Sequence, residues 1–239
     1  MADPQVAHVT TVHRPSDTRI AMKECEALVR SGIETCLIAQ EGTPPPVDGL
    51  TYVRLPKRIG RIQRVLRGST DAWRALKVLQ PAVVQVHDPE LIPLAILFKL
   101  RHNVKVVYDS HEELPKQIMG KEYIPRLLRR PMAAIGALLE KLADKFLDGI
   151  VAATPAIARN YRNENTILVQ NYPWRDSYDE SYTPVIPDEN RAVYVGAISL
   201  ERGAREMIES VQQVREPAEL ILAGPMSSSA KELLRGTKS

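Results

Sequence analysis

Two kinds of segment alternate along the chain as far as Gln170: short runs rich in Val, Ile and Leu, and longer stretches whose apolar residues recur at helical spacing. Several short runs are nearly continuous in Val and Ile, as expected of strands that helices cover on both faces. The predicted strands are Val6–Val12, Glu34–Gln40, Leu50–Leu55, Ala82–His87, Val104–Asp109, Gly149–Ala153 and Thr166–Gln170. The predicted helices are Ile20–Arg30, Arg61–Leu79, Glu90–Lys99, Ile124–Leu147 and Ala156–Arg162. This alternation predicts an α/β fold with a doubly wound, parallel Rossmann-like sheet of about seven strands.

The pattern changes after Asn171. Residues 173–190 are rich in Pro, Tyr and acidic side chains, a composition typical of an interdomain linker. The alternation then restarts, with strands predicted at Ala192–Gly196 and Leu220–Ala223 and helices at Ala204–Val214 and from Ser229. Two βα units bury little apolar surface. We therefore expect residues 191–239 to be an incomplete second Rossmann-like unit, following an N-terminal domain of residues 1–172.

Composition adds few constraints on function. Apolar residues make up 44% of the chain and charged residues 26%, and the net charge of +3 does not require a nucleic-acid partner. Cys25 and Cys36 lack metal-ligand spacing, and we interpret them as reduced core thiols. The N-terminus shows no signal-peptide pattern and the apolar runs are too short to span a bilayer, so we expect a cytoplasmic protein.

The candidate functional residues lie in loops after predicted strands, where a doubly wound sheet binds its ligands. In the first such loop, Asp17 is suited to cap the following helix, and Arg19 together with backbone N–H groups favours an anion. Considered alone, this loop is explained better by a structural role, with Asp17 as a cap and Arg19 in solvent. No G-x-G-x-x-G follows any strand, which disfavours a nicotinamide dehydrogenase.

Two further loops combine a histidine with acidic neighbours. His87 and Asp88 end one predicted strand, and His111 and Glu112 follow the next. We expect both imidazoles to project at the same rim of the sheet, which favours a site over two structural histidines. A Zn or Mn site is an alternative, but the spacings match no metal signature and we expect no metal. Contact with a sugar hydroxyl or a phosphate suits His111 better.

The second unit offers a further strand–loop–helix junction at Gly196–Gly203. Gly196 lets the backbone approach a ligand, and Arg202 adds positive charge at a helix N-terminus. The junction therefore suits a diphosphate, although Gly203 also has a structural explanation because glycine eases the turn.

Five segments carry a family resemblance: Asp17-Thr18-Arg19-Ile20 with Lys23-Glu24, VVQVHDPELIPLA, VVYDSHEELP, ILVQNYP and YVGAISLERG. They occur in the order seen in family 4 glycosyltransferases, and the sequence most closely resembles bacterial enzymes that build capsular, O-antigen and other surface polysaccharides. The resemblance covers essentially the whole chain. It implies the GT-B fold, in which a Rossmann-like acceptor domain and a nucleotide-sugar domain enclose a catalytic cleft.

The resemblance also implies roles for single residues. His111 matches the cleft histidine that contacts the donor sugar beside the reacting carbon, and Arg202 matches the basic residue that holds the donor diphosphate. The segment His13–Asp17 matches the region near the donor phosphate and the acceptor, so Asp17 is a candidate to orient the acceptor. The implied activity is retaining transfer from a nucleotide-sugar donor to a glycan or polyprenyl-linked acceptor, without a metal ion or another cofactor.

Two departures from the family pattern modify this expectation. Ala197 stands where many relatives carry a second phosphate-binding Arg, so diphosphate affinity is expected to be lower or to depend on other groups. The family's paired-glutamate motif, which binds the ribose and the donor sugar, is expected beyond residue 239. Two alternatives stay open: a nucleotide-sugar epimerase of the same fold, and a non-catalytic module that binds the acceptor, a lipid or a partner chain.

A basic segment, Lys57–Lys77, carries Lys and Arg against one acidic residue, Asp71. Its apolar residues fall at helical spacing, and four arginines occupy other positions: Arg58, Arg61, Arg64 and Arg67. One interpretation is the solvated face of an ordinary Rossmann helix. The other is an interfacial helix that meets an anionic membrane surface or a lipid diphosphate acceptor, which makes the protein peripheral on the cytoplasmic face of the membrane. Nucleic acid is disfavoured because aromatic residues are scarce here.

Overall fold

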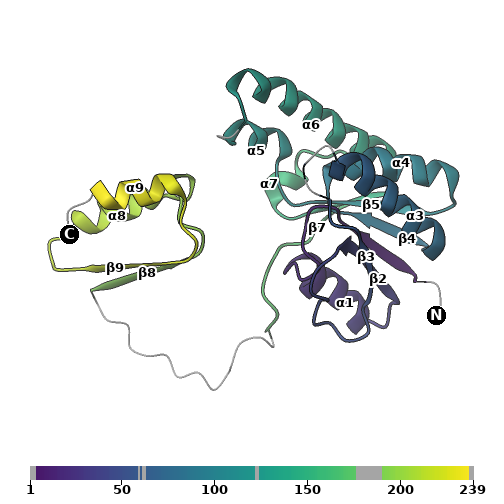
Figure 1. Cartoon of the computed structure of the whole chain (residues 1–239), viewed down its shortest axis with the longest axis horizontal. Coiled ribbons are helices and arrows are strands. Elements are labelled where there is room, and N and C mark those ends of the chain that lie inside the picture. Colours follow the sequence, from purple (N-terminus) through teal and green to yellow (C-terminus); the bar gives the residue numbers. More distant parts are fainter. Residues whose placement is uncertain (1–3, 59, 61–62, 122–123, 176–189, 237–239) are drawn as a thin grey trace. The chain divides into compact units, whose positions relative to one another are not determined.

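The computed structural model describes residues 4–58, 60, 63–121, 124–175 and 190–236. The chain divides into two compact units, residues 1–177 and residues 178–239, which are described separately below (Figure 1). Most of the predicted linker, residues 173–190, lies outside the described residues. None of the described helices combines the length and the apolar character needed to cross a membrane.

The first unit contains a seven-stranded sheet in which every strand runs parallel to its neighbours. Its strands are β1 (Val6–Val9), β2 (Thr35–Gln40), β3 (Thr51–Leu55), β4 (Val83–Val86), β5 (Lys105–Ser110), β6 (Gly149–Ala152) and β7 (Thr166–Leu168). Their order, β3-β2-β1-β4-β5-β6-β7, places β1, β4 and β5 at the centre. The predicted parallel α/β fold is therefore confirmed.

Helices connect the strands and cover the sheet (Figure 1). They are α1 (Glu26–Arg30), α3 (Ser69–Leu79), α4 (Ile92–Arg101), α5 (Leu114–Gly120), α6 (Arg126–Phe146) and α7 (Pro155–Ala158). π-Helical segments at Ile20–Cys25 and Arg64–Gly68 lead into α1 and α3, and a 3-10 turn at Pro89–Leu91 leads into α4. The sequence pattern missed α5, whose seven residues are too few to show a clear helical period.

Alternation along the strands gives the sheet two different faces. On β2, Cys36 and Ile38 join the larger core, which also contains buried residues of α3, α4 and α6. Leu37 and Ala39 point the other way and pack with Ile20 of the π-helical segment Ile20–Cys25. The same alternation continues through β1, β4 and β5, where the larger core contains Ala7, Val9, Val84, Val86, Val106 and Tyr108.

The opposite face of the central strands is polar. His8 on β1 and Asp109 on β5 are fully buried there, and Gln85 on β4 bonds to Glu24 of the π-helical segment. Because strand side chains alternate, the residues that could not join the apolar core are gathered against a single helical segment. This arrangement determines where the buried charges of the first unit lie.

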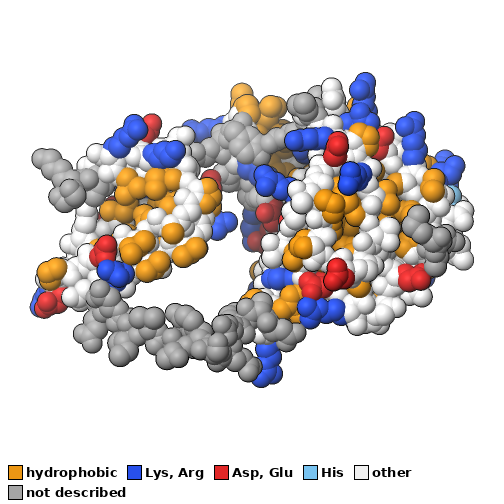
Figure 2. Space-filling view, turned by 60° about the horizontal axis from the view of Figure 1, so that its bottom comes forward, with side chains coloured by type: hydrophobic (Ala, Val, Ile, Leu, Met, Phe, Trp, Pro, Cys, Tyr) orange, Lys and Arg blue, Asp and Glu red, His pale blue; other side chains and the backbone are white. Residues whose placement is uncertain are grey.

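The second unit has two parallel strands, β8 (Arg191–Val195) and β9 (Glu219–Ala223), and two helices, α8 (Ala204–Gln212) and α9 (Ser228–Gly236). Its small core includes Ala204 of α8 and Ala230 of α9. Val193, Val195 and Ile221 are exposed, and Figure 2 shows hydrophobic side chains gathered on the surface of this unit. This matches the expectation that two βα units bury little apolar surface.

The loops after β8 and β9 meet closely. The N–H of Gly196 donates to the carbonyl of Ala223 (2.9 Å), and that of Ile198 to the carbonyl of Pro225 (2.8 Å). A Cβ added at Gly224 would collide with the carbonyl group of Gly196. Glycine is therefore required at position 224, a constraint that the sequence pattern did not reveal.

We predict that α3 tolerates truncation on one face only. Leu76→Ala should lower the free energy of unfolding of the first unit by about 2–5 kcal/mol, because Leu76 is fully buried against the sheet. Val78→Ala is the matched control, with a change of less than about 0.5 kcal/mol, because Val78 is 81% exposed. Urea unfolding followed by circular dichroism measures both values. Equal losses for the two variants would contradict the orientation of α3.

Candidate functional site

The carboxyl ends of β1, β4 and β5 lie side by side, and hydrogen bonds of Asp88 connect the end of β4 to the end of β1. Its Oδ2 accepts hydrogen bonds from the hydroxyl groups of Thr10 (2.9 Å) and Thr11 (3.2 Å). The same oxygen accepts from the backbone N–H groups of Thr11 and Val12. Asp88, predicted as a cleft residue, is almost completely buried and fixes the loop that follows β1.

Asp17 and His13 form an acid–histidine pair in that loop. Oδ1 of Asp17 accepts from the N–H groups of Arg19 (2.9 Å) and Ile20 (3.0 Å), so Asp17 does act as a cap. Its Oδ2 lies 3.2 Å from Nδ1 of His13. Partial burial opposes ionisation of Asp17, but His13 and the two N–H groups lower its pKa to about 2.

The same pair acts on the histidine. The hydrogen bond to Asp17 raises the pKa of His13, with burial opposing and Asp88 adding to the increase. Nε2 of His13 lies 3.6 Å from Oδ1 of Asp88. The loop after β1 is thus organised by two carboxylates, one from the loop itself and one from the end of β4.

Arg19 is not in solvent. Its guanidinium binds Asp109 through two hydrogen bonds, from Nε to Oδ2 (3.1 Å) and from Nη2 to Oδ1 (2.6 Å). Nε also lies 3.0 Å from Oε1 of Glu24, and Nη1 donates to the carbonyl of Val169 (3.1 Å). The structural interpretation of a solvated Arg19 is therefore wrong, because the planar guanidinium is the natural partner of the buried Asp109 carboxylate.

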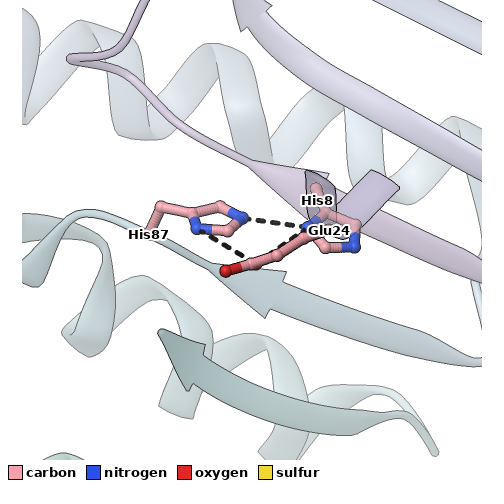
Figure 3. A group of neighbouring side chains, drawn as sticks. All are labelled: His8, Glu24 and His87. Carbon is pink, nitrogen blue, oxygen red and sulfur yellow. Dashed lines mark hydrogen bonds and ion pairs between the residues drawn. The ribbon is translucent and has the colours of Figure 1, made fainter. Parts of the chain in front are cut away.

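A histidine pair continues the network across the sheet. Nδ1 of His87 lies 3.0 Å from Oδ2 of Asp109, and Nε2 of His87 lies 3.0 Å from Nδ1 of His8. Figure 3 shows the two rings beside Glu24, whose Oε2 lies 4.0 Å from Nδ1 of each histidine. Gln85 donates to this oxygen over 2.6 Å. Both imidazoles are fully buried.

Burial sets the charges of this network. Burial and His87 lower the pKa of His8 to about 3, so His8 is neutral at physiological pH. Burial and the charge of Asp109 raise the pKa of Glu24 to about 7. Burial opposes ionisation of Asp109, yet nearby His111 and the hydrogen bonds from His87 and Arg19 hold its pKa well below the usual range.

Three side chains of this network could serve as ligands of a metal ion. Ligand atoms of His8, Glu24 and His87 lie within 4.8 Å of one another, a donor set that suits Zn²⁺. With Asp109 ionised, however, His87 donates through Nδ1 and accepts from His8 through Nε2. An ion bound to Nε2 of His87 and Nδ1 of His8 would have to replace the hydrogen bond between the two rings. We therefore interpret the group as a hydrogen-bond network, in which Nε2 of His8 has no hydrogen-bond partner among the described residues.

His111 lies in the wall of a cavity at the same end of the sheet. The cavity has a volume of about 520 Å³, and its lining includes His13 and Glu112 at the rim and Ile118 and Met132 from α5 and α6. A second cavity of about 450 Å³ is lined by Asp17, Arg19 and again His13 and His111. The two histidine rings meet edge to face, with centroids 5.2 Å apart, and both residues line both cavities.

The network connects to the cavity through Asp109. Nδ1 of His111 lies 3.5 Å from Oδ2 of Asp109, the oxygen that also binds His87 and Arg19. Burial opposes protonation of His111, but Asp109 and Glu112 raise its pKa. Both imidazoles predicted at one rim line the cavity, but the His111 side chain is 23% exposed whereas that of His87 is fully buried.

The remaining predicted residues belong to the second unit and to the basic segment, of which Arg64 also lines the 520 Å³ cavity. Gly196 precedes the loop after β8, Arg202 ends a 3-10 turn, and Gly203 adopts a left-handed conformation (φ 80°) before α8. In the basic segment, Arg58 pairs with Asp71 (2.6 Å) and Arg64 with Glu90 (3.0 Å). Arg67 is exposed, and Arg61 lies outside the described residues.

We predict that Asp17→Asn lowers the pKa of His13, because the amide keeps an oxygen for the capping N–H groups but removes the charge that stabilises the imidazolium. A proton NMR titration of the histidine ring signals measures this change. Asp71→Asn, which alters a distant ion pair, is the control and should leave His13 unchanged. An unaltered His13 midpoint in Asp17→Asn would exclude the pair.

The sign of the stability effect follows from the two pKa shifts. The contribution of His13 is complete below about pH 6.5, the pKa of an unfolded histidine, and is lost as pH rises through its higher folded pKa. The contribution of Asp17 is complete above about pH 4 and is lost as pH falls towards 2. Asp17→Asn should therefore destabilise the protein most between about pH 4 and 6.5.

Comparisons with solved structures show the fold. Sucrose-phosphate synthase from Thermosynechococcus elongatus aligns with 96% of this chain at 14% identity and a TM-score of 0.67. Anabaena Alr3699/HepE, solved in complex with UDP and glucose, aligns with 97% of the chain at 9% identity and a TM-score of 0.66. A glycosyltransferase from Rickettsia africae aligns with 96% at 12% identity and a TM-score of 0.62. This chain covers 66%, 64% and 64% of those chains, in that order, and the fold is that of GT-B glycosyltransferases.

The search of curated protein sequences found no match. The model of Glycosyltransferase Family 4 matches residues 18–167, which include Arg19, His87, Asp109 and His111. The match covers more than half of the chain and most of the first unit. The chain therefore belongs to glycosyltransferase family 4.

Proposed function

We propose that the protein transfers a sugar from a nucleotide-diphosphate donor to an acceptor, with retention of the anomeric configuration. The observation that carries this proposal is the placement of His111 in a family 4 chain, in a cavity wall at the carboxyl ends of the central strands. In the reaction, the bond between the anomeric carbon and the diphosphate breaks, a bond to the acceptor oxygen forms, and the acceptor hydroxyl loses its proton.

His111 is proposed to position the donor sugar. Its Nδ1 faces the ionised Asp109, which leaves Nε2 as the ring atom available for a hydrogen bond to a sugar hydroxyl. Asp17 is proposed to orient the acceptor through His13, its hydrogen-bond partner, which lines both cavities. Fixed side chains of this kind contribute to rate by holding the reacting groups in place.

The donor diphosphate is proposed to bind at the loop after β8 without a metal ion. Arg202 supplies a positive charge, and the adjacent N-terminus of α8 supplies backbone N–H groups. Gly196 and Gly203 let the backbone approach the phosphates. Cationic groups stabilise the charge that develops on a departing diphosphate, and this is a large catalytic effect. The similar Alr3699/HepE has also been solved with UDP-glucose, which supports a nucleotide-sugar donor.

The acceptor is proposed to be a glycan or a polyprenyl-linked sugar used in surface-polysaccharide synthesis at the cytoplasmic face of the membrane. The larger cavity supports this choice because it combines a polar rim with apolar residues from α5 and α6. A polar rim suits sugar hydroxyls, and the apolar wall suits the start of a lipid chain.

We predict that the 239-residue chain binds nucleotide sugars weakly and turns them over negligibly, because it covers 64–66% of the similar structures. Isothermal titration calorimetry with uridine- and guanosine-diphosphate sugars measures the binding. Arg202→Gln should remove the residual heat, whereas Arg205→Gln, three residues further on, should not. Micromolar binding by the wild-type chain, or multiple turnover, would overturn the prediction.

In the full-length enzyme, we predict that His111→Ala lowers kcat by about 100-fold or more while the fold is kept, because the loss affects positioning and not core packing. His102→Ala is the control, since His102 precedes β5 at the opposite end of that strand and should leave kcat unchanged. Steady-state transfer assays and circular dichroism provide the two measurements. Full activity in His111→Ala, or its unfolding, would remove the proposed role.

The same assay separates the two rival functions. An epimerase would convert the donor sugar without any acceptor, and a binding module would give neither product. Each result would contradict glycosyl transfer.

A further inference from the structure

Helix α6 exposes large apolar residues in the first unit. Leu127 is 91% exposed, and Leu128, Ile135 and Leu138 are each more than half exposed. The opposite side of the helix is packed, because Gly136 fits against Leu114 and Ile118 of α5 and Ala143 joins the main core. Such long apolar side chains are costly to leave in water when they gather on one helix.

The charges on the exposed side of α6 all have one sign. Its exposed residues include Arg126, Arg130, Lys141 and Lys145 and no Asp or Glu. Within the part of the chain that the structure describes, none of these four residues forms an ion pair. Arg58 and Arg64 of the basic segment differ, because their charges are already matched by Asp71 and Glu90.

An amphipathic helix with leucine on its outer face, flanked by unmatched Lys and Arg, has the chemistry of an interfacial helix. Apolar side chains enter the boundary between headgroups and acyl chains, and the cations meet anionic headgroups. A protein partner of equal area would need acidic groups placed opposite four separate cations, whereas an anionic bilayer satisfies them in any register.

The position of the helix relative to the cavity favours the same partner. Met132 near the start of α6 and Ile124 just before this helix line the 520 Å³ cavity, and so do Leu114 and Ile118 of α5. Figure 1 shows α5 and α6 together at one border of the first unit, beyond the sheet. A bilayer contacting α6 would therefore lie beside the cavity that holds the proposed acceptor.

We propose that the exposed face of α6, from Arg126 to Lys145, docks the protein on an anionic lipid bilayer. This inference names the surface for the membrane association that was proposed above, but it rests on α6 alone and does not require glycosyl transfer. The segment at Arg64–Gly68 is the competing surface, because Leu66 is 65% exposed and Arg67 is exposed.

The test is flotation of the 239-residue chain with vesicles of phosphatidylcholine alone or mixed with phosphatidylglycerol, without donor or acceptor. We expect binding to the anionic vesicles that weakens with salt. Leu127→Gln/Arg130→Gln should reduce the partition coefficient by at least about tenfold, because each lost cation alone accounts for about fivefold. The matched variant Leu66→Gln/Arg67→Gln should remain within about twofold of wild type.

Further controls make each result decisive. Val78→Gln/Leu100→Gln removes two exposed apolar residues from α3 and α4 and should bind like wild type. Circular dichroism confirms that each variant is folded, as expected for exposed positions. Absence of wild-type binding, or a loss confined to the Leu66/Arg67 variant, would overturn the proposal. So would sedimentation velocity showing a wild-type dimer that Leu127→Gln/Arg130→Gln converts to a monomer without any binding to vesicles.

Binding to vesicles and transfer activity are measured separately. Transfer is assayed with the full-length enzyme, because negligible turnover is expected of the 239-residue chain. Flotation of the chain together with no transfer by the full-length enzyme would support the docking surface and contradict the proposed function. Transfer to a soluble acceptor without any binding to vesicles would support the proposed function and contradict the docking surface.

Discussion

The first unit depends on the interactions of one buried carboxylate, that of Asp109. It accepts hydrogen bonds from Arg19 and His87 and faces His111, so it joins β4, β5 and the helical segment after β1 at a single point. A buried charge is tolerated only when its partners are complete, and removal of one partner costs about 3–5 kcal/mol. Asp109 therefore makes the positions of three candidate site residues interdependent.

The need to pair the Asp109 carboxylate also explains why the candidate site lies at the carboxyl ends of the central strands. Alternation along the strands turns Val and Ile towards one core and His8, Gln85 and Asp109 towards the other face, where Arg19 and Glu24 meet them. His111 follows Asp109 by two residues, so it leaves the sheet where the network ends and the cavity begins. The buried network thus supports the accessible histidine from below.

Much of the fold could be predicted from the sequence because parallel strands between helices leave continuous Val and Ile runs, and these located all seven strands of the first sheet. The ends of the predicted strands also located His87 and His111 at one edge of the sheet. Sequence reasoning missed Glu24 and His8 because their partners lie on other elements, and the pairing depends on which face each strand residue occupies. A polar residue inside an apolar strand, such as His8, was the available signal. The ion pairs of Arg58 and Arg64 were equally hidden, since their partners are 13 and 26 residues away in the chain.

The central claim is that this arrangement serves retaining glycosyl transfer. The most direct measurement is proton NMR of the product that the full-length protein forms from a panel of uridine- and guanosine-diphosphate sugars and a polyprenyl-linked sugar acceptor. The account predicts a new glycosidic bond whose anomeric coupling constant shows the configuration of the donor. An inverted product, or an epimerised sugar formed without the acceptor, would contradict it.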